Sequence, residues 1–128
     1  SEWFEAATAD SRRHLLIFEM NKQALGFVNF REHEILPVAN WGFYLSSGSP
    51  PGLGRDLGVA ALRHAFSTLK LHKVCGEALD FNGASIKLHL KLGFKQEGLL
   101  REHYIQNDRY HDVIRFGILE HEWLQANL

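Results

Sequence analysis

Two glycines, Gly52 and Gly54, lie in the run PPGLGR at residues 50–55, directly before a helical pattern. The start of a helix offers unpaired backbone N–H groups and the positive end of the helix dipole, which together bind phosphate. Glycine lets the backbone approach such a ligand closely. No Lys-Ser/Thr pair follows, which excludes a Walker A loop, and GLGRDLG does not have the spacing of the dinucleotide fingerprint. The run predicts a phosphate-binding loop, with an ordinary helix start as the alternative.

A second set of polar residues follows later in the chain. Asn82, Ser85 and His89 stand at i, i+3 and i+7, which places them on one face of a helix. Such a stripe can line a binding groove, but it is equally typical of any surface helix beside an apolar face. The periodicity alone leaves both interpretations open.

The elements that must position these residues follow from hydrophobic periodicity and turn signals. Strands are expected at residues 14–20, 24–31, 38–45, 73–81, 94–106 and 110–119. Residues 1–9 are expected to be the end of an amphipathic helix, and a helix of about 16 residues is expected after the loop at 46–54. A short helix is expected at 82–92, with Asn82 as its N-cap and Gly93 at its C-terminus, and residues 121–125 begin a last helical turn. Apolar faces are expected from two sets of residues: Trp41, Phe43 and Leu45; and Ile114, Phe116 and Ile118.

Composition narrows the class of protein. The chain has 128 residues with 14 Lys+Arg against 15 Asp+Glu, which argues against a broad electrostatic grip on nucleic acid. Cys75 is the single cysteine, so neither an internal disulfide nor a cysteine-based zinc site is expected, and the eight histidines form no recognisable metal motif. No apolar run reaches the length of a membrane span and none resembles a signal peptide. We therefore expect a single cytoplasmic domain over residues 1–128, without a metal, that does not bind nucleic acid or a membrane.

Taken together, the two segments resemble the signature motifs of the GCN5-related N-acetyltransferase (GNAT) family. The first motif, Q/R-x-x-G-x-G/A, corresponds to residues 49–54, and the second ends in a Lys-x-Gly-Phe box at residues 91–94. Ser49 replaces the usual Gln or Arg, and Pro50 and Pro51 remove backbone donors. The resemblance implies an α/β fold of the α+β type: a mixed, mostly antiparallel sheet flanked by helices. The family's first strand and first helix have no counterpart, so an N-terminally truncated domain is expected.

The resemblance also implies the co-substrate, acetyl-CoA, and the residues that hold it. The strand at residues 41–45 corresponds to the one whose backbone binds the pantetheine arm, and the glycine loop to the one that holds the pyrophosphate. The expected cofactor-binding residues are Phe43, Tyr44, Leu45, Gly52, Leu53, Gly54, Arg55, Asn82 and Ser85.

Two residues are expected to carry the proton transfers. His89 stands where many family members have a tyrosine that protonates the leaving thiolate, and an imidazole with a pKa near ~6.5 can do the same. Asn40 occupies the position at which family members often have a glutamate base, and an amide cannot take a proton. Glu77 on the next strand is then the remaining candidate base, acting through water. The alternatives are a surface histidine and a solvent-facing glutamate.

Within the family, several runs resemble the branch that acetylates a UDP-linked 4-amino-4,6-dideoxy sugar in pseudaminic acid biosynthesis. They are residues 40–44, 51–55, 71–73, 76–77 and 97–101. The small-molecule amine would then be a UDP-sugar, held by cations and a stacking ring from the set Arg31, Trp41, Arg101, His103 and Tyr104. Two alternatives remain: an N-terminal acetyltransferase of ribosomal-protein type, and a non-catalytic acetyl-CoA-binding module. A homodimer is compatible with each.

Overall fold

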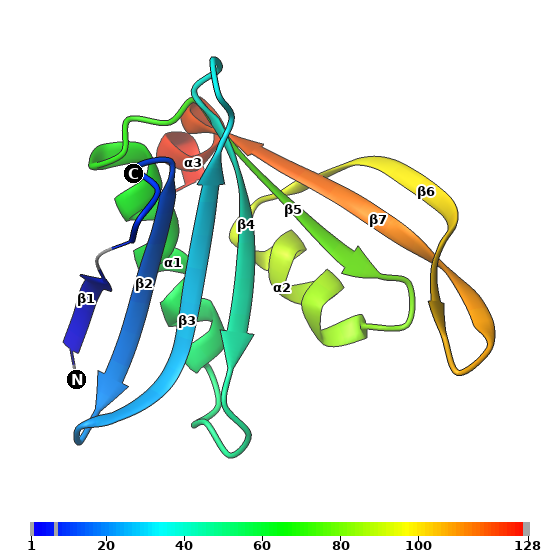
Figure 1. The fold of residues 1–128 in the computed structure, drawn as a ribbon, viewed down its shortest axis with the longest axis horizontal. Coiled ribbons are helices and arrows are strands. Elements are labelled where there is room, and N and C mark those ends of the chain that lie inside the picture. The colour runs from blue at the N-terminus through cyan, green and yellow to red at the C-terminus, as the bar shows by residue number, and fades with distance from the viewer. Residues whose placement is uncertain (1, 7, 127–128) are drawn as a thin grey trace.

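A seven-stranded sheet forms the centre of the molecule, in a computed structural model that describes residues 2–6 and 8–126. The strands lie in the order β1-β2-β3-β4-β5-β7-β6 (Figure 1). The bounds are β1 Glu2–Ala6, β2 Arg13–Met20, β3 Gln23–Glu32, β4 Val38–Leu45, α1 Leu53–Ser67, β5 Lys73–Leu79, α2 Gly83–Leu92, β6 Lys95–Gln106, β7 Arg109–Leu119 and α3 Glu120–Ala126. β4 and β5 pair in parallel and the other neighbours are antiparallel, which confirms the predicted mixed, mostly antiparallel sheet.

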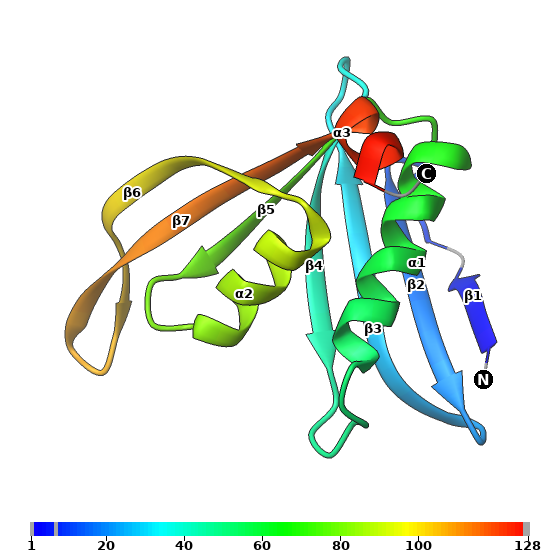
Figure 2. The ribbon, with the colours of Figure 1, turned by 180° about the vertical axis from the view of Figure 1, so that it is seen from behind.

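The core lies between one face of the sheet and the three helices, and α1 passes over β2 and β3 in Figure 2. Alternate residues of each strand point to this face, as the pleat requires. Of the predicted apolar sets, Phe116, Ile118 and Trp41 are buried, Phe43 and Ile114 pack at the edge of the core, and Leu45 is exposed. In the described part of the chain, no helix is long and apolar enough to span a membrane.

Turns and a helix cap define several element ends. Asn21 and Lys22, and likewise Asn107 and Asp108, have positive φ, as a two-residue hairpin turn requires. The Asn82 side chain accepts a hydrogen bond from the Ser85 N–H at the start of α2, which confirms the predicted N-cap.

The prediction for residues 1–9 was wrong where the structure describes them. Glu2–Ala6 forms the edge strand β1, paired with β2 from Glu2↔Glu19 to Ala6↔Leu15, instead of the end of a helix. A helix this short is marginal without a packed face, whereas the free edge of β2 satisfies the backbone of the segment. Residues 1 and 7 lie outside the described part.

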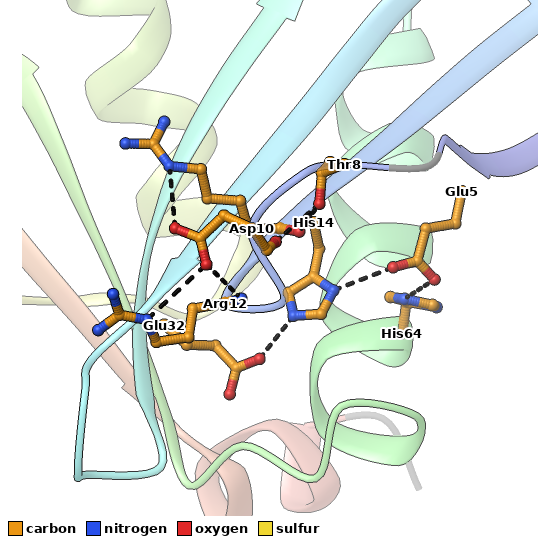
Figure 3. A network of polar contacts seen from close by, with 8 residues as sticks. Glu5, Thr8, Asp10, Arg12, His14, Glu32 and His64 are labelled. Carbon is orange, nitrogen blue, oxygen red and sulfur yellow. Dashed lines mark hydrogen bonds and ion pairs between the residues drawn. The ribbon is translucent and has the colours of Figure 1, made fainter.

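A chain of titratable groups connects β1 to the rest of the molecule. His14 on β2 lies between two carboxylates: its Nδ1 is 3.0 Å from Glu5 Oε1 on β1, and its Nε2 is 2.5 Å from Glu32 Oε2 on β3 (Figure 3). The other oxygen of Glu5 lies 3.4 Å from His64 Nε2 on α1. Because both partners of His14 are acceptors, the imidazolium, with two N–H donors, satisfies this arrangement best.

The pKa of His14 follows from these contacts. Partial burial alone would lower the pKa of His14, but its hydrogen bonds to Glu32 and Glu5 outweigh burial and raise the pKa above the ordinary value of 6.5. A raised native pKa stabilises the fold below about pH 6.5, and this stability is lost as the pH rises through the native pKa.

We therefore expect His14→Gln to destabilise the protein at pH 6 and to have progressively less effect as the pH increases toward 9. The measurement is the free energy of unfolding of both proteins across this range. His72→Gln, at an exposed position, should show no such trend. A difference between wild type and His14→Gln that stays constant with pH would contradict the role of the imidazolium.

Candidate functional site

Strands β4 and β5 pair for only three residues and then separate. The last pair is Asn40↔Cys75, although β4 continues to Leu45 and β5 to Leu79 (Figure 1). Toward β3, His33 donates its N–H to the Val38 carbonyl and Ser46 donates to the Leu25 carbonyl, both at 2.8 Å. Hydrogen-bonded and non-hydrogen-bonded pairs alternate in an antiparallel ladder, so Tyr44 directs its N–H and C=O toward β3. Phe43 and Leu45 therefore direct theirs into the opening.

A groove of about 550 Å³ lies beside this opening, between β4 and the helices α1 and α2. It brings together seven of the predicted cofactor residues from segments far apart in the sequence. Its lining comprises Phe43, Leu45, Gly52, Gly54, Arg55, Asn82, Ala84, Ser85, Lys87, Leu88, His89 and Lys91.

Two predicted cofactor residues do not line the groove. Tyr44 is 54% exposed. Its ring stacks on that of Phe27, with the ring centroids 4.6 Å apart, on the sheet face away from the helices. The Leu53 side chain is buried in the core, and its N–H donates to the Pro50 carbonyl at 3.2 Å. The backbone donors that remain at the start of α1 are therefore those of Gly54 and Arg55.

The two glycines of the loop serve different purposes. Gly52 is the N-cap of α1 with φ of 83°, a left-handed conformation that side chains other than glycine rarely adopt. A Cβ on Gly54 would lie 3.2 Å from Leu45 Cδ1 and 4.0 Å from Leu88 Cδ2, so Gly54 keeps the groove open between β4 and α2.

The lining of the groove is cationic. Arg55, Lys87 and Lys91 contribute positive charges, and no carboxylate belongs to the lining among the described residues. Sequence reasoning assigned neither lysine to the cofactor groove, although their i, i+4 spacing places them on one face of α2, one turn after Ala84. Three cations around a helix N-terminus suit a ligand that carries several phosphates.

His89 borders the groove but is turned into the core, with only 3% of its surface exposed. The Trp41 Nε1–H donates to His89 Nε2 at 3.1 Å, and His89 Nδ1 lies 2.8 Å from the Ser85 carbonyl oxygen, to which it donates. Burial lowers the pKa of His89 below the ordinary value, against the smaller opposing effect of the Ser85 hydrogen bond. The ring is therefore neutral with both nitrogens engaged, and its contacts favour a structural role; general-acid catalysis stays a prediction.

Gly76 on β5 accommodates the Trp41–His89 hydrogen bond. A Cβ at this position would lie 2.5 Å from His89 Nε2 and 2.6 Å from Trp41 Nε1. The two rings thus rest directly on the backbone of β5, and they connect β4 to α2 across the opening between the strands.

Glu77 lies on the opposite face of the sheet from the groove. It follows Cys75, the partner of Asn40, by two residues, so Glu77 and Asn40 point to the same face beside the opening. Both side chains are exposed, and Glu77 Oε1 lies 3.6 Å from Arg115 Nε. A carboxylate beside the opening between β4 and β5 can accept a proton through a water molecule. The role of Glu77 as the base stays a prediction.

The five residues predicted to hold UDP do not form one pocket. Trp41 is buried and bonded to His89, so its predicted role as a stacking ring was wrong. Arg31 pairs with Asn40 in the sheet, whereas Arg101, His103 and Tyr104 are exposed on β6. In the described part of the chain, no group of three or more His, Cys, Asp or Glu side chains could hold a metal ion.

Comparison with known proteins gives consistent matches. The acetyltransferase (GNAT) domain family matches residues 1–95. An SPbeta prophage-derived uncharacterized N-acetyltransferase, YokL of Bacillus subtilis, is 29% identical over 125 residues, which cover 95% of this chain and 70% of YokL. The spermidine N(1)-acetyltransferase of Vibrio cholerae is 37% identical over 76 residues, or 59% of this chain and 44% of that enzyme. That sequence alignment spans less than half of the relative.

Solved structures agree with the fold. The Vibrio cholerae spermidine N-acetyltransferase in complex with CoA and spermine superposes with a TM-score of 0.84 at 28% identity, covering 91% of this chain and 70% of that one. A structure of the same enzyme described as dodecameric gives a TM-score of 0.85 at 28% identity, covering 93% and 71%. At this identity the match supports the shared fold and leaves the acceptor open.

Substitution of His89 separates its two roles. His89→Phe leaves the Trp41 N–H and the Ser85 carbonyl without partners, so we expect the free energy of unfolding to fall by about 1–3 kcal/mol. His89→Gln can accept from Trp41 and donate to Ser85, but it cannot act as an acid, so it should retain both stability and kcat. A folded, stable His89→Gln protein whose kcat falls by ~10²-fold would instead establish the general acid.

Proposed function

The chain belongs to the acetyltransferase (GNAT) domain family, and we propose that it transfers the acetyl group of acetyl-CoA to a primary amine of a small molecule. The observation that carries this proposal is the opening between β4 and β5, with a cationic groove on one face of the sheet and Glu77 on the other. The opening allows co-substrate and acceptor to approach the same point from opposite faces. The proposal is tested by measuring the release of CoA from acetyl-CoA in the presence of a small-molecule amine.

The groove supplies what CoA needs for binding. Its phosphates would lie against the N–H groups of Gly54 and Arg55 and the ammonium groups of Lys87 and Lys91. The amides of its pantetheine arm would pair with the backbone of Phe43 and Leu45, as an added strand would. The thioester would then lie near the point where β4 and β5 separate.

The reaction needs a neutral amine, donors for the developing oxyanion and a proton for the departing thiolate. A backbone N–H of β4 that has no partner on β5 provides an oxyanion donor. Glu77, beside the opening between β4 and β5, is the proposed base and would act through a water molecule. Asn40 cannot serve as the base because its amide cannot take a proton. The Trp41–His89 pair would act by positioning α2, and the source of the thiolate proton is tested by the His89 variants.

Two acceptor classes have support from different observations. The comparisons favour a polyamine, because spermidine N-acetyltransferases are among the relatives and solved structures. The sequence runs quoted above favour an amino sugar linked to UDP, and the relatives and solved structures described above do not support that choice. Homodimer formation and a cytoplasmic location stay predictions.

The groove can be tested by direct binding. Gly54→Val places a branched side chain between Leu45 and Leu88, so we expect loss of CoA binding in a protein that still folds. Lys87→Ala with Lys91→Ala removes two phosphate partners, and the Kd for CoA should rise by about tenfold or more. Isothermal titration calorimetry measures both.

Matched controls are available for both changes. Gly98→Val adds the same side chain at a site on β6 where no atom lies within 4 Å of the new Cβ, and Lys22→Ala removes a lysine in the β2–β3 turn. Both controls should bind CoA as the wild type does. Unchanged affinity in folded Gly54→Val would place the cofactor elsewhere.

A competition assay decides the acceptor. Thiol release from acetyl-CoA is followed with spermidine, with a UDP-linked 4-amino-4,6-dideoxy sugar and with N-terminal peptides of ribosomal proteins, each with and without millimolar UDP. If the acceptor is a sugar nucleotide, acetyl transfer to the UDP-linked sugar should be inhibited by UDP. If the acceptor is a polyamine, spermidine should be acetylated at a rate that UDP does not change. Transfer to peptides alone would contradict both acceptor classes, and CoA binding without any turnover would indicate a non-catalytic module.

A further inference from the structure

The side-chain amide of Asn29 on β3 lies beside the opening between β4 and β5, on the face of the sheet away from the groove. Asn29 pairs with Gly42, and a Cβ on Gly42 would lie 2.8 Å from Asn29 Oδ1 and 3.0 Å from Asn29 Nδ2. The amide therefore rests directly on the backbone of β4, which glycine at this position allows. The Asn29 side chain is half-buried, and among the described residues it makes no hydrogen bond. A half-buried amide without a protein partner is available to a ligand.

Glu77 stands level with this amide on the other side of the opening. The last pair of β4 and β5 is Asn40↔Cys75. Gly42 and Glu77 each follow that pair by two residues, so they lie at the same level of the sheet, and Glu77 points to the same face as Asn29. Across β3, β4 and β5 in Figure 1, the amide, the bare glycine backbone and the carboxylate therefore form one row. An amine in this row would have an oxygen on either side and the opening in front of it.

The next row along the same face is apolar. Phe27 pairs with Tyr44 and their rings stack, while Ile17 continues the row on β2. Phe27 is 39% exposed and Tyr44 is 54% exposed, and no charged side chain belongs to the row on these three strands. The row lies about 7 Å along β4 from Gly42. Exposed rings at this distance offer apolar area that favours binding when a hydrocarbon covers it.

We propose that Asn29 and the Phe27–Tyr44 pair form the acceptor subsite. The Asn29 carbonyl oxygen accepts an N–H of the reacting amine, and the two rings pack on the hydrocarbon attached to the nitrogen. The inference rests on the proposed acetyl transfer and specifies its acceptor as a primary amine with an uncharged hydrocarbon segment next to the nitrogen.

The same arrangement orients the nitrogen for attack. A neutral amine that donates one N–H to Asn29 keeps its lone pair free to point through the opening at the thioester carbon. The new N–C bond forms as the C–S bond breaks and CoA leaves as the thiolate. The proton that the nitrogen then loses goes to Glu77, on the other side of the row, through water.

Binding without turnover tests the role of the amide. With saturating CoA in the groove, butylamine is titrated into isotope-labelled protein, and NMR follows the side-chain NH2 of Asn29 and the backbone N–H of Tyr44. We expect both signals to shift. Asn29→Leu keeps the shape of the side chain but not its oxygen, so it should weaken this binding by about tenfold. Asn29→Asp keeps an oxygen acceptor and should bind better than Asn29→Leu, and Gln23→Leu, an exposed amide at the start of β3, serves as the control.

Kinetics with unbranched primary amines from ethylamine to hexylamine test the aromatic pair. In the wild type, kcat/KM should rise by about three- to fourfold for each methylene group that covers the rings. Tyr44→Ala should flatten this dependence and leave the KM for acetyl-CoA unchanged, whereas Tyr110→Ala, an exposed tyrosine on β7, should keep it. Asn29→Leu should lower kcat/KM for every amine by the same factor.

Two results would overturn the proposal: a wild-type kcat/KM that does not depend on chain length, or an Asn29→Leu protein that binds and acetylates butylamine as the wild type does. If Asn29→Leu fails to fold, Asn29→Ala takes its place in both experiments. Absence of CoA release with every amine would count against the proposed function, and the butylamine titration would still decide whether the subsite exists.

Discussion

The early end of pairing between β4 and β5 is the constraint on which the site depends. After Asn40↔Cys75 the two strands share no further pairs, and within the described part of the sheet the backbone polar groups of Phe43 and Leu45 have no partner strand. Unpaired backbone groups are costly to bury, so this edge must face water or a ligand. The groove, its cations and the carboxylate on the other face are all arranged around that unpaired edge.

The separation of the strands needs support, and the Trp41–His89 hydrogen bond provides it. Trp41 projects from β4 just where pairing ends, His89 projects from α2, and Gly76 lets both rings contact the backbone of β5. The His89 ring also stacks on Phe116 at 4.9 Å. An open sheet would otherwise expose its core here; the buried polar pair fixes the distance between β4 and α2 and thereby the width of the groove.

Much of this could be predicted from the sequence because it is set locally. Strands and the Asn82 cap depend on neighbouring residues. The glycine loop alone left an ordinary helix start open, and the cofactor groove was expected from the family resemblance. The features that could not be predicted depend on contacts between segments that are far apart in the sequence. The β1 strand exists because β2 has a free edge, and the polar stripe of α2 gave no indication that His89 would face Trp41 while Lys87 and Lys91 faced the groove.

Amide hydrogen exchange at three consecutive residues of β4 tests the central claim most directly. The Tyr44 N–H is directed to β3 and should be protected with or without ligand, whereas the Phe43 and Leu45 N–H groups should exchange rapidly in the free protein and become protected when CoA is added. The measurement needs no assumption about the acceptor. Phe43 and Leu45 amides that exchange at the same rate with and without saturating CoA would contradict the assignment of the opening as the co-substrate site.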